Sequence, residues 1–334
     1  MRQQIDEAPR AQWCRIPDAA REGLWHAGDG HAIRRIDFAP AADVPLRGGL
    51  LFLPGRGDIY EKYLEVLSHW SRQGWHATAI DWRGQAGSGR EGRDSQTGHI
   101  ADFSIWIKDL ADFWQDWAAS VPGPHALVGH SMGGHLALRA LAERRVDPFA
   151  CVLTTPMLGF FAWGMPLWAQ HSLARAHIAS GDPRRPAWKV SEKPLSPRHK
   201  RMLLLTHDAR RYAEELCWKK QRPHLVMGSA SWGWMERALE SMRGLQAPGV
   251  LESVRTPVQL FTTSADGLVS HAAILRAARR LPHGELVTLG REARHELLRE
   301  TDSVREPVLA AIDAFLARHR PESVVQAAAA SIGG

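Results

Sequence analysis

The chain of 334 residues, with 44% apolar and 23% charged residues, has the composition of a soluble globular protein and the length for one large domain or two modest ones. Its formal net charge of +6 fits a well-solvated surface, an anionic membrane surface or an acidic substrate. Paired zinc ligands and an RNP-like aromatic strand are missing from the sequence, which excludes the common nucleic-acid modules.

Strand and helix patterns alternate through the first half of the chain. Residues 1–30 carry scattered apolar positions and predict an irregular lead-in before a first strand at 31–38. Further strands are predicted as short apolar runs at 49–53, 75–81, 125–128 and 149–155. Helices are predicted from apolar periodicity at about 60–73, 100–118 and 135–144. This alternation favours a parallel sheet with helices on both faces, which binds ligands at the carboxyl ends of its strands.

The alternation breaks between about residues 157 and 249, where the sequence is helical, loop-rich and rich in tryptophan, arginine and lysine. We interpret this stretch as a helical cap inserted over the strand ends. Strands at 257–263 and 285–289 and helices at 270–281 and 301–318 resume the pattern. The predicted fold class is α/β, with a lead-in at 1–30, a core formed by 31–156 and 250–320, a helical cap (lid) at 157–249 and a flexible, alanine-rich tail at 321–334.

The sequence Gly-His-Ser-Met-Gly-Gly at 129–134 has the form G-x-S-x-G between an apolar run and a helical pattern. A chain that turns from strand to helix within about one residue forces its middle residue, Ser131, into a strained backbone conformation. Small flanking residues let the two elements cross closely. A Gly/Ser-rich turn is the simpler alternative, but the flanking strand and helix favour a nucleophile elbow that exposes the Ser131 hydroxyl at the sheet edge.

A serine nucleophile requires a base within hydrogen-bond reach and a carboxylate that orients the base. In this topology the order along the chain is Ser, then Asp or Glu, then His. Asp266 follows the strand at 257–263 and His295 follows the strand at 285–289, so both can reach the edge where Ser131 lies. The less favoured bases are His271 and His283, in surface positions, and His130, which is expected to point away from the elbow. The less favoured acids are Asp208 and Asp302, which are expected to be helix caps.

The oxyanion that forms at the attacked carbonyl needs backbone N–H donors. One predicted donor is the N–H of Met132, directly after the serine and at the positive end of its helix. The other is the N–H of Arg56, in a loop whose neighbouring glycines allow close approach. The Arg56 guanidinium is expected to pair with Asp58 or Glu61, with contact to an anionic substrate as the alternative.

These motifs resemble those of the α/β-hydrolase family, and more narrowly its monoacylglycerol lipase and bacterial lysophospholipase group. The matching segments are 53–57, 61–63, 81–85, the elbow at 129–134, 264–266 and 293–296, together with the cap segments 205–212 and 228–234. The resemblance covers about residues 30 to 320. It implies a serine hydrolase that cleaves carboxylic esters through an acyl-enzyme, without metal or cofactor.

Two positions depart from the family pattern. Pro54-Gly55 stands where monoacylglycerol lipases commonly have His-Gly, which favours the bacterial lysophospholipase branch. Ala86 stands where a glycine is usual, so we expect a tighter loop there.

The cap composition favours a lipid ester as substrate. Its tryptophans suit an acyl chain, although packing of the cap onto the sheet is the alternative role. Its excess of cations would attract a phosphate headgroup or an anionic membrane surface, which favours a lysophospholipid over a monoacylglycerol. The expected partners are therefore a small lipid ester and, peripherally, an anionic membrane, with no nucleic acid. The alternative functions are a catalytically silent binding protein and a serine peptidase or acyltransferase on the same fold.

The cysteines and the N-terminus indicate a location. Cys14, Cys151 and Cys217 lie far apart without C-x-x-C spacing, so we expect free thiols, no structural zinc and a reducing compartment. The first residues lack the apolar core of a signal peptide, and no apolar run approaches the length of a membrane span. The predicted location is the cytoplasm.

Overall fold

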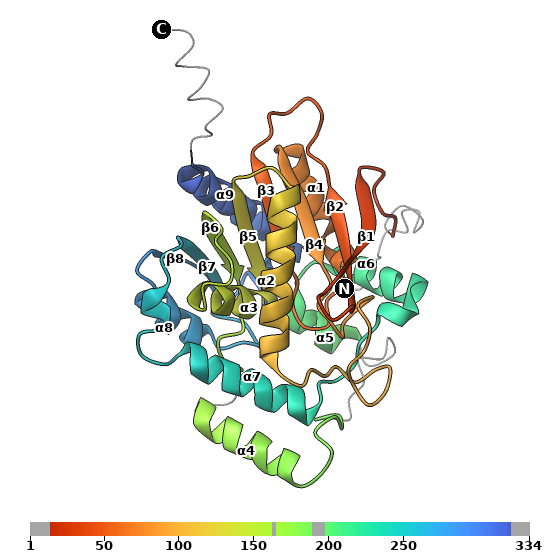
Figure 1. Cartoon of the computed structure of the whole chain (residues 1–334), viewed down its shortest axis with the longest axis vertical. Helices are drawn as coiled ribbons and strands as arrows, with labels where there is room; N and C mark the ends of the chain where they lie inside the picture. Colours follow the sequence, from red (N-terminus) through yellow and green to blue (C-terminus); the bar gives the residue numbers. More distant parts are fainter. Residues whose placement is uncertain (1–13, 162–164, 189–197, 322–334) are drawn as a thin grey trace, which may run out of the picture.

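The computed structural model describes residues 14–161, 165–188 and 198–321, and within them eight strands form one sheet in the order β1-β2-β4-β3-β5-β6-β7-β8 (Figure 1). The strands are β1 (Ala20–His26), β2 (Ala32–Phe38), β3 (Gly48–Leu53), β4 (Trp75–Ile80), β5 (His125–His130), β6 (Ala150–Thr154), β7 (Val258–Thr263) and β8 (Gly284–Leu289). Only β1 with β2 and β2 with β4 pair antiparallel, and all other described pairs are parallel. The mostly parallel sheet predicted from the sequence is confirmed.

Helices cover both faces of this sheet (Figure 1). They are α1 (Leu64–Arg72), α2 (Phe103–Ser120), α3 (Met132–Ala142), α8 (His271–Arg280) and α9 (Asp302–His319), with short 3₁₀ turns η2 (Tyr60–Tyr63), η4 (Leu251–Ser253) and η5 (Leu297–Arg299). Successive strand residues point to opposite faces, so Leu50 and Phe52 pack in the apolar layer of α1 and α9, whereas Leu51 and Leu53 pack in that of α2 and α3. Burial on both faces explains why these strands read as continuous apolar runs.

The irregular lead-in expected at 1–30 is wrong where the structure describes it. Ala20–His26 forms β1, which pairs along its whole length with β2 at the edge of the sheet. Backbone hydrogen bonds stabilise this strand more than apolar burial does, because none of its residues is buried and Leu24 is 59% exposed. Such an edge strand lacks the apolar alternation that identifies a strand in sequence. Residues 1–13 of the lead-in and 322–334 of the tail lie outside the described residues.

The expectation of three free thiols is also wrong. Cys14 and Cys217 form a disulfide across 203 residues of sequence, and only Cys151 is a free, buried thiol. The pairing has no local signature, because it depends on how the cap folds back over the sheet. A reducing compartment therefore no longer follows from the cysteines.

The inserted stretch between β6 and β7 is helical in its described parts. It contains α4 (Leu167–Ala179), α5 (Arg198–Leu205), α6 (Ala209–Gln221), the turn η3 (Pro223–Leu225) and α7 (Trp232–Leu245). Helix α7 packs on the core, since Ala238, Met242 and Leu245 share the apolar layer of α2 and α3. Helix α4 packs on α7 and lies farthest from the sheet (Figure 1). The division into a core and a cap at 157–249 remains a prediction.

Candidate active site

The turn between β5 and α3 has the strained geometry predicted for an elbow. Ser131 has φ 50° and ψ −115°, and α3 begins at the next residue. Two glycines permit this crossing: a Cβ at Gly129 would lie 2.7 Å from the Cα of Gly134, and a Cβ at Gly133 would lie 2.2 Å from the carbonyl oxygen of Leu53. Any larger side chain at either position would push the helix away from the strand.

Asp266 and His295 meet as a buried pair beyond the ends of β7 and β8. The Nδ1 atom of His295 lies 2.7 Å from Oδ2 of Asp266. The other carboxylate oxygen accepts from the N–H groups of Leu268 and Val269, at 2.7 and 2.9 Å. These bonds hold the carboxylate in place, so Nδ1–H of the imidazole points to the acid and Nε2 is the nitrogen that can accept a proton.

The pair shifts the pKa values of its two members in opposite directions. Burial alone would raise the pKa of Asp266, but the charge and hydrogen bond of His295, with the two backbone N–H groups, hold the pKa below its ordinary 3.8. Burial alone would lower the pKa of His295, but Asp266, with the charges of Glu296 and Asp58, outweighs burial and raises that pKa above its ordinary 6.5. Next to them, burial lowers the pKa of His130 to about 3, so this ring is neutral.

Several contacts bring the loop of His295 against the elbow. The Oγ1 of Thr155 donates to the carbonyl of His295 at 2.8 Å, and the N–H of Ser131 donates to the carbonyl of Thr154, one residue earlier, at 3.0 Å. The rings of His130 and His295 lie 4.9 Å apart between centroids. In the described part of the chain, no hydrogen bond joins the Ser131 hydroxyl to His295. The catalytic roles of Ser131, Asp266 and His295 therefore remain predictions.

The loop after β3, at 54–58, lies directly against the elbow. A Cβ on Gly55 would lie 3.1 Å from the Cβ of Ser131. The N–H of Gly55 donates to Oδ2 of Asp58 at 2.9 Å, and that of Gly57 donates to Oε1 of Gln85 at 2.7 Å. The residue between these two tethered glycines is Arg56, the predicted oxyanion donor.

The second predicted donor, the N–H of Met132, belongs to the first turn of α3, where backbone N–H groups have no intrahelical acceptor. Its role, like that of Arg56, remains a prediction. Near the loop, Ala86 has φ 45°, the left-handed conformation that explains why glycine is usual at this position.

The side chain of Arg56 extends toward the cap. Its guanidinium donates to the carbonyl of Gly228 at 2.8 Å and lies over the rings of Trp188 and Trp234, at 5.6 and 5.2 Å. The ion pairs that the structure describes for Asp58 and Glu61 involve other cations, which are Lys62, Arg34 and Arg222.

One buried residue near the site was not identified as functional from the sequence. The side chain of Lys62, in η2, is 1% exposed and contacts three carboxylates. The segment 61–63 belongs to the motifs of the resemblance, but its sequence alone does not indicate what its residues do. The available signal was a lysine inside an apolar stripe, between Tyr60 and Tyr63.

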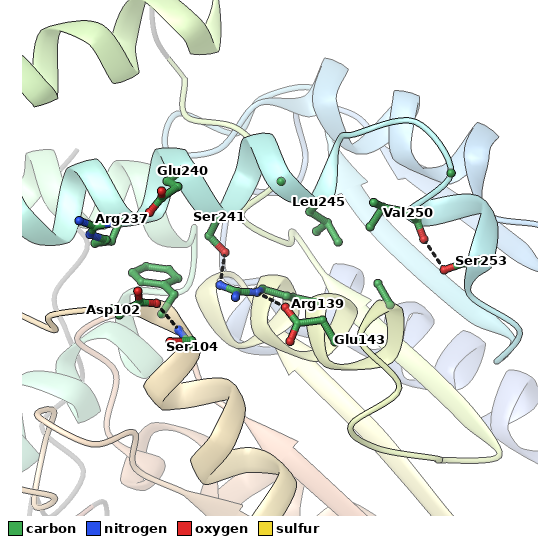
Figure 2. A pocket seen from close by; sticks show the side chains of 14 residues that line it. Asp102, Ser104, Arg139, Glu143, Arg237, Glu240, Ser241, Leu245, Val250 and Ser253 are labelled. Atoms are coloured by element: carbon green, nitrogen blue, oxygen red, sulfur yellow. Dashed lines mark hydrogen bonds and ion pairs between the residues drawn. The ribbon is translucent and has the colours of Figure 1, made fainter.

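A separate cavity of about 660 Å³ opens between α7 and the ends of α2 and α3 (Figure 2). Four of its charged side chains form two ion pairs, Arg139 with Glu143 and Arg237 with Glu240, both at 2.6 Å. No residue of the predicted active site lines it.

Comparison with known proteins points to lipid esterases. The family model of serine aminopeptidases, S33, matches residues 45–302. Lysophospholipase L2 of Escherichia coli (strain K12) is 29% identical over 322 residues, covering 90% of this chain and 91% of its own length. A probable lysophospholipase L2 of Haemophilus influenzae is 23% identical over 269 residues, covering 80% and 83%.

Solved structures share the fold at low sequence identity. A soluble variant of monoglyceride lipase from Saccharomyces cerevisiae superposes with a TM-score of 0.73 at 18% identity, over 92% of this chain and 97% of its own. The monoacylglycerol lipase of Paleococcus ferrophilus gives a TM-score of 0.65 at 18% identity, over 89% and 99%. At this sequence identity, the two similarities show that the chain shares the fold of these proteins.

Proposed function

The chain belongs to the serine aminopeptidase S33 family of α/β hydrolases, and we propose that it is a lysophospholipase with monoacylglycerols as secondary substrates. It is a carboxylic-ester hydrolase acting on lipids. The observation that carries the finer proposal is the match to lysophospholipase L2 along nine tenths of both chains. The buried Asp266–His295 pair beside the strained Ser131 supports a serine mechanism.

In the proposed mechanism, the Ser131 oxygen attacks the acyl carbon while Nε2 of His295 takes its proton. The N–H groups of Arg56 and Met132 stabilise the oxyanion. Collapse of this intermediate breaks the ester bond, and His295 returns the proton to the departing alcohol oxygen, leaving an acyl-enzyme. A water molecule then attacks the acyl carbon with His295 again as base, which releases the fatty acid and restores the Ser131 hydroxyl.

Exposed apolar side chains around the acid and base loops support an acyl substrate. We call Phe161, Leu204 and Leu268 the apolar rim, and they are 53%, 40% and 37% exposed. The N–H of Phe161 donates to the carbonyl of Leu268 at 3.0 Å, and the carbonyl of Leu204 accepts from the N–H of His295 at 3.4 Å. Exposed apolar surface next to a reactive site suits a lipid chain or a lipid surface.

The basic residues of the cap support contact with an anionic membrane less strongly than the cap composition indicates. Lys219 pairs with Glu215 at 2.6 Å, and Arg222 pairs with Glu22 at the same distance. Lys189 and Lys193 lie outside the described residues. We therefore attribute the proposed peripheral membrane contact mainly to the apolar rim. Equal sedimentation with neutral and with anionic vesicles would support this origin, and binding to anionic vesicles alone would contradict it.

The cytoplasmic location also stays a proposal. Among the described residues, no helix combines the length and apolarity needed to cross a bilayer. Fractionation of the producing cells, with detection of the native protein, would test the location.

Replacement of Ser131 by alanine tests the enzyme mechanism. We expect Ser131→Ala to lower hydrolysis of lysophospholipid by at least about a thousandfold and to abolish labelling by a fluorophosphonate. Ser120→Ala, at the end of α2, is the matched control and should keep wild-type activity. Turnover retained in Ser131→Ala, with an unchanged circular-dichroism spectrum, would remove this residue from the mechanism.

A peptidase is the second candidate, because the description of the matching family is that of an aminopeptidase. A hydrolysis panel of lysophospholipids, monoacylglycerols, short esters and amino-acyl amides separates the two candidates. Preference for the amides, measured as kcat/KM, would overturn the lipase proposal. Absence of both turnover and labelling would instead support a catalytically silent binding protein.

A further inference from the structure

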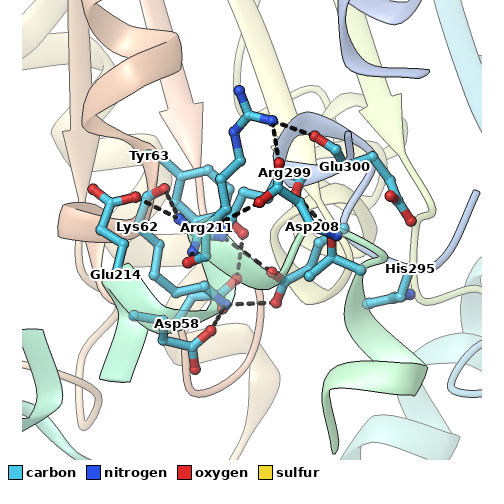
Figure 3. Close-up of polar contacts among 12 residues, drawn as sticks. Asp58, Lys62, Tyr63, Asp208, Arg211, Glu214, His295, Arg299 and Glu300 are labelled. Carbon is cyan, nitrogen blue, oxygen red and sulfur yellow. Dashed lines mark hydrogen bonds and ion pairs between the residues drawn. The ribbon is translucent and has the colours of Figure 1, made fainter. Parts of the chain in front are cut away.

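The buried ammonium of Lys62 lies at the junction of three parts of the molecule (Figure 3). Its Nζ is 2.6 Å from Oδ1 of Asp58, 2.6 Å from Oε1 of Glu296 and 3.3 Å from Oε2 of Glu215. Asp58 belongs to the loop at 54–58, which we call the oxyanion loop, and Glu296 to the loop at 290–296 after β8, which we call the base loop. Glu215 belongs to cap helix α6. A lysine this deeply buried persists only where opposite charges compensate it.

On the oxyanion side, Lys62 acts through Asp58. The Oδ2 atom of Asp58 accepts from the N–H of Gly55 at 2.9 Å and from the hydroxyl of Tyr63 at 2.7 Å. Its other oxygen binds Lys62. The orientation of this carboxylate therefore fixes the peptide between Pro54 and Gly55. The next peptide along the chain carries the N–H of Arg56, the proposed oxyanion donor.

On the base side, Lys62 acts through Glu296, the residue directly after His295. The Oε1 atom of Glu296 binds Lys62, and its Oε2 accepts from Arg299 at 3.2 Å. Its N–H donates to the carbonyl of Leu205 at the end of α5, at 2.8 Å. The backbone that carries the imidazole is thereby held between the ammonium and the cap.

Stability alone is a poor explanation for this cluster. Removing charges from water costs energy that their mutual attraction regains only in part, so well-packed apolar residues of similar volume often stabilise a protein as much or more. Burial would lower the pKa of Lys62, but its three carboxylates outweigh burial and raise the pKa above its ordinary 10.5. The ammonium is therefore charged at every pH at which activity would be measured.

We propose that Lys62 is a positioning residue for ester hydrolysis, whose ammonium holds the oxyanion loop and the base loop in register through Asp58 and Glu296. The inference rests on the proposed serine mechanism and adds a group that never contacts the substrate. A displacement of about 1 Å at a reacting group can cost about a hundredfold in rate. The loss of register should accordingly lower kcat and leave KM nearly unchanged.

Two isosteric variants test this role. Asp58→Asn and Glu296→Gln each remove one charge that Lys62 binds and keep the shape of the side chain. We expect each to lower kcat on a short ester by about 10- to 100-fold, with KM within about threefold of wild type. Asp58 and Glu296 also help to raise the pKa of His295, so kcat is compared on the alkaline plateau, where the imidazole is neutral in every variant.

The double variant separates positioning from two independent defects. If one ammonium couples the two loops, Asp58→Asn/Glu296→Gln loses little more than the worse single variant, because the coupling is broken only once. Independent defects would multiply, and such multiplication would overturn the proposal. The folded Lys62→Met variant should have the same kcat as the double variant, because it lacks the ammonium that couples the two loops.

A matched control lies at the other end of the strands, away from the carboxyl ends where the active site is predicted. Asp313→Asn removes the negative charge that accepts hydrogen bonds from His69 and Gln73, at 2.9 and 2.6 Å, next to the amino end of β4, and thereby weakens both bonds. It should lower the midpoint of urea unfolding without changing kcat.

The rate of fluorophosphonate labelling provides a second readout that needs no lipid. A wild-type protein that is neither labelled nor active on any ester refutes the serine mechanism and this inference with it. An active wild type whose Asp58→Asn and Glu296→Gln variants keep kcat within twofold refutes only the role of Lys62.

Discussion

The carboxylate of Asp266 uses both oxygens, and this division explains how it can orient His295 without acting as a base itself. One oxygen accepts two backbone N–H groups and the other accepts the imidazole. Burial would raise the pKa of Asp266, but the charge and hydrogen bond of His295, together with the backbone donors, stabilise the negative charge and keep this pKa below its ordinary value. The proton therefore stays on His295 when the pair is protonated.

The pH dependence of activity follows from the raised pKa of His295. The general base must be neutral, so kcat/KM should fall as pH decreases through a midpoint above 6.5. For stability the sign is opposite: a folded pKa above the unfolded one gives stabilisation that is present below the unfolded pKa and is lost as pH rises through the folded pKa. The protein should thus be most active where this stabilisation is absent.

Asp266→Asn should move the acidic limb of kcat/KM to lower pH and reduce its plateau by about 10³- to 10⁴-fold. The amide removes the negative charge that raises the pKa of His295. Asp102→Asn, which can still cap α2, is the control and should leave both features unchanged. An unshifted limb in Asp266→Asn would show that another group governs the profile.

At the scale of elements, the end of α3 carries a residue whose backbone favours glycine. The N–H of Arg145 donates to the carbonyl of Ala140, and the N–H of Arg144 donates to that of Leu141, which together form a Schellman motif. Arg144 occupies the left-handed position of this motif with φ 54°. Its side chain is exposed, so the conformation costs energy that no burial offsets.

Arg144→Gly should raise the free energy of unfolding by about 1 kcal/mol, measured by urea denaturation, because it removes this strain. Arg145→Gly is the control one residue further along, where φ is not positive, and it should bring no gain. Equal effects of the two substitutions would contradict the argument.

The elements also show where sequence patterns succeed. The buried strands and α2 are close to their predicted ranges because each has a strong apolar period. Helix α3 begins at Met132, three residues before the predicted start, because glycine has low helix propensity and Gly133-Gly134 obscured the pattern. The edge strand β1 was missed because its register depends on pairing with β2.

At the scale of the whole molecule, the contact of Asp266 with His295 was predictable and the cluster around Lys62 was not. Both members of the pair follow strands of a parallel sheet, whose carboxyl ends share one edge. Lys62 and Glu296 lie 234 residues apart, and Glu215 comes from the inserted helices. Contacts that depend on how an insertion folds back leave no local pattern.

The disulfide between Cys14 and Cys217 is another such contact, and it should stabilise the whole chain. Replacing both cysteines by serine should lower the free energy of unfolding by about 2–4 kcal/mol under non-reducing conditions, because the unfolded chain gains conformational freedom. Urea denaturation checks this value. A reductant should destabilise the wild type and not the double variant. Alkylation of all three cysteines in unfolded, unreduced protein would contradict the pairing.

Helix α7 belongs to the inserted stretch by sequence and to the core by packing, and this limits how the protein can be rebuilt. A chimaera that exchanges residues 157–249 would strip Ala238, Met242 and Leu245 from the layer over α2 and α3. A graft whose junction precedes Ser231, the N-cap of α7, would keep that layer and still replace α4, α5 and α6. A graft designed to change the acyl preference should therefore end before residue 231, which is eighteen residues before the cap boundary predicted at residue 249.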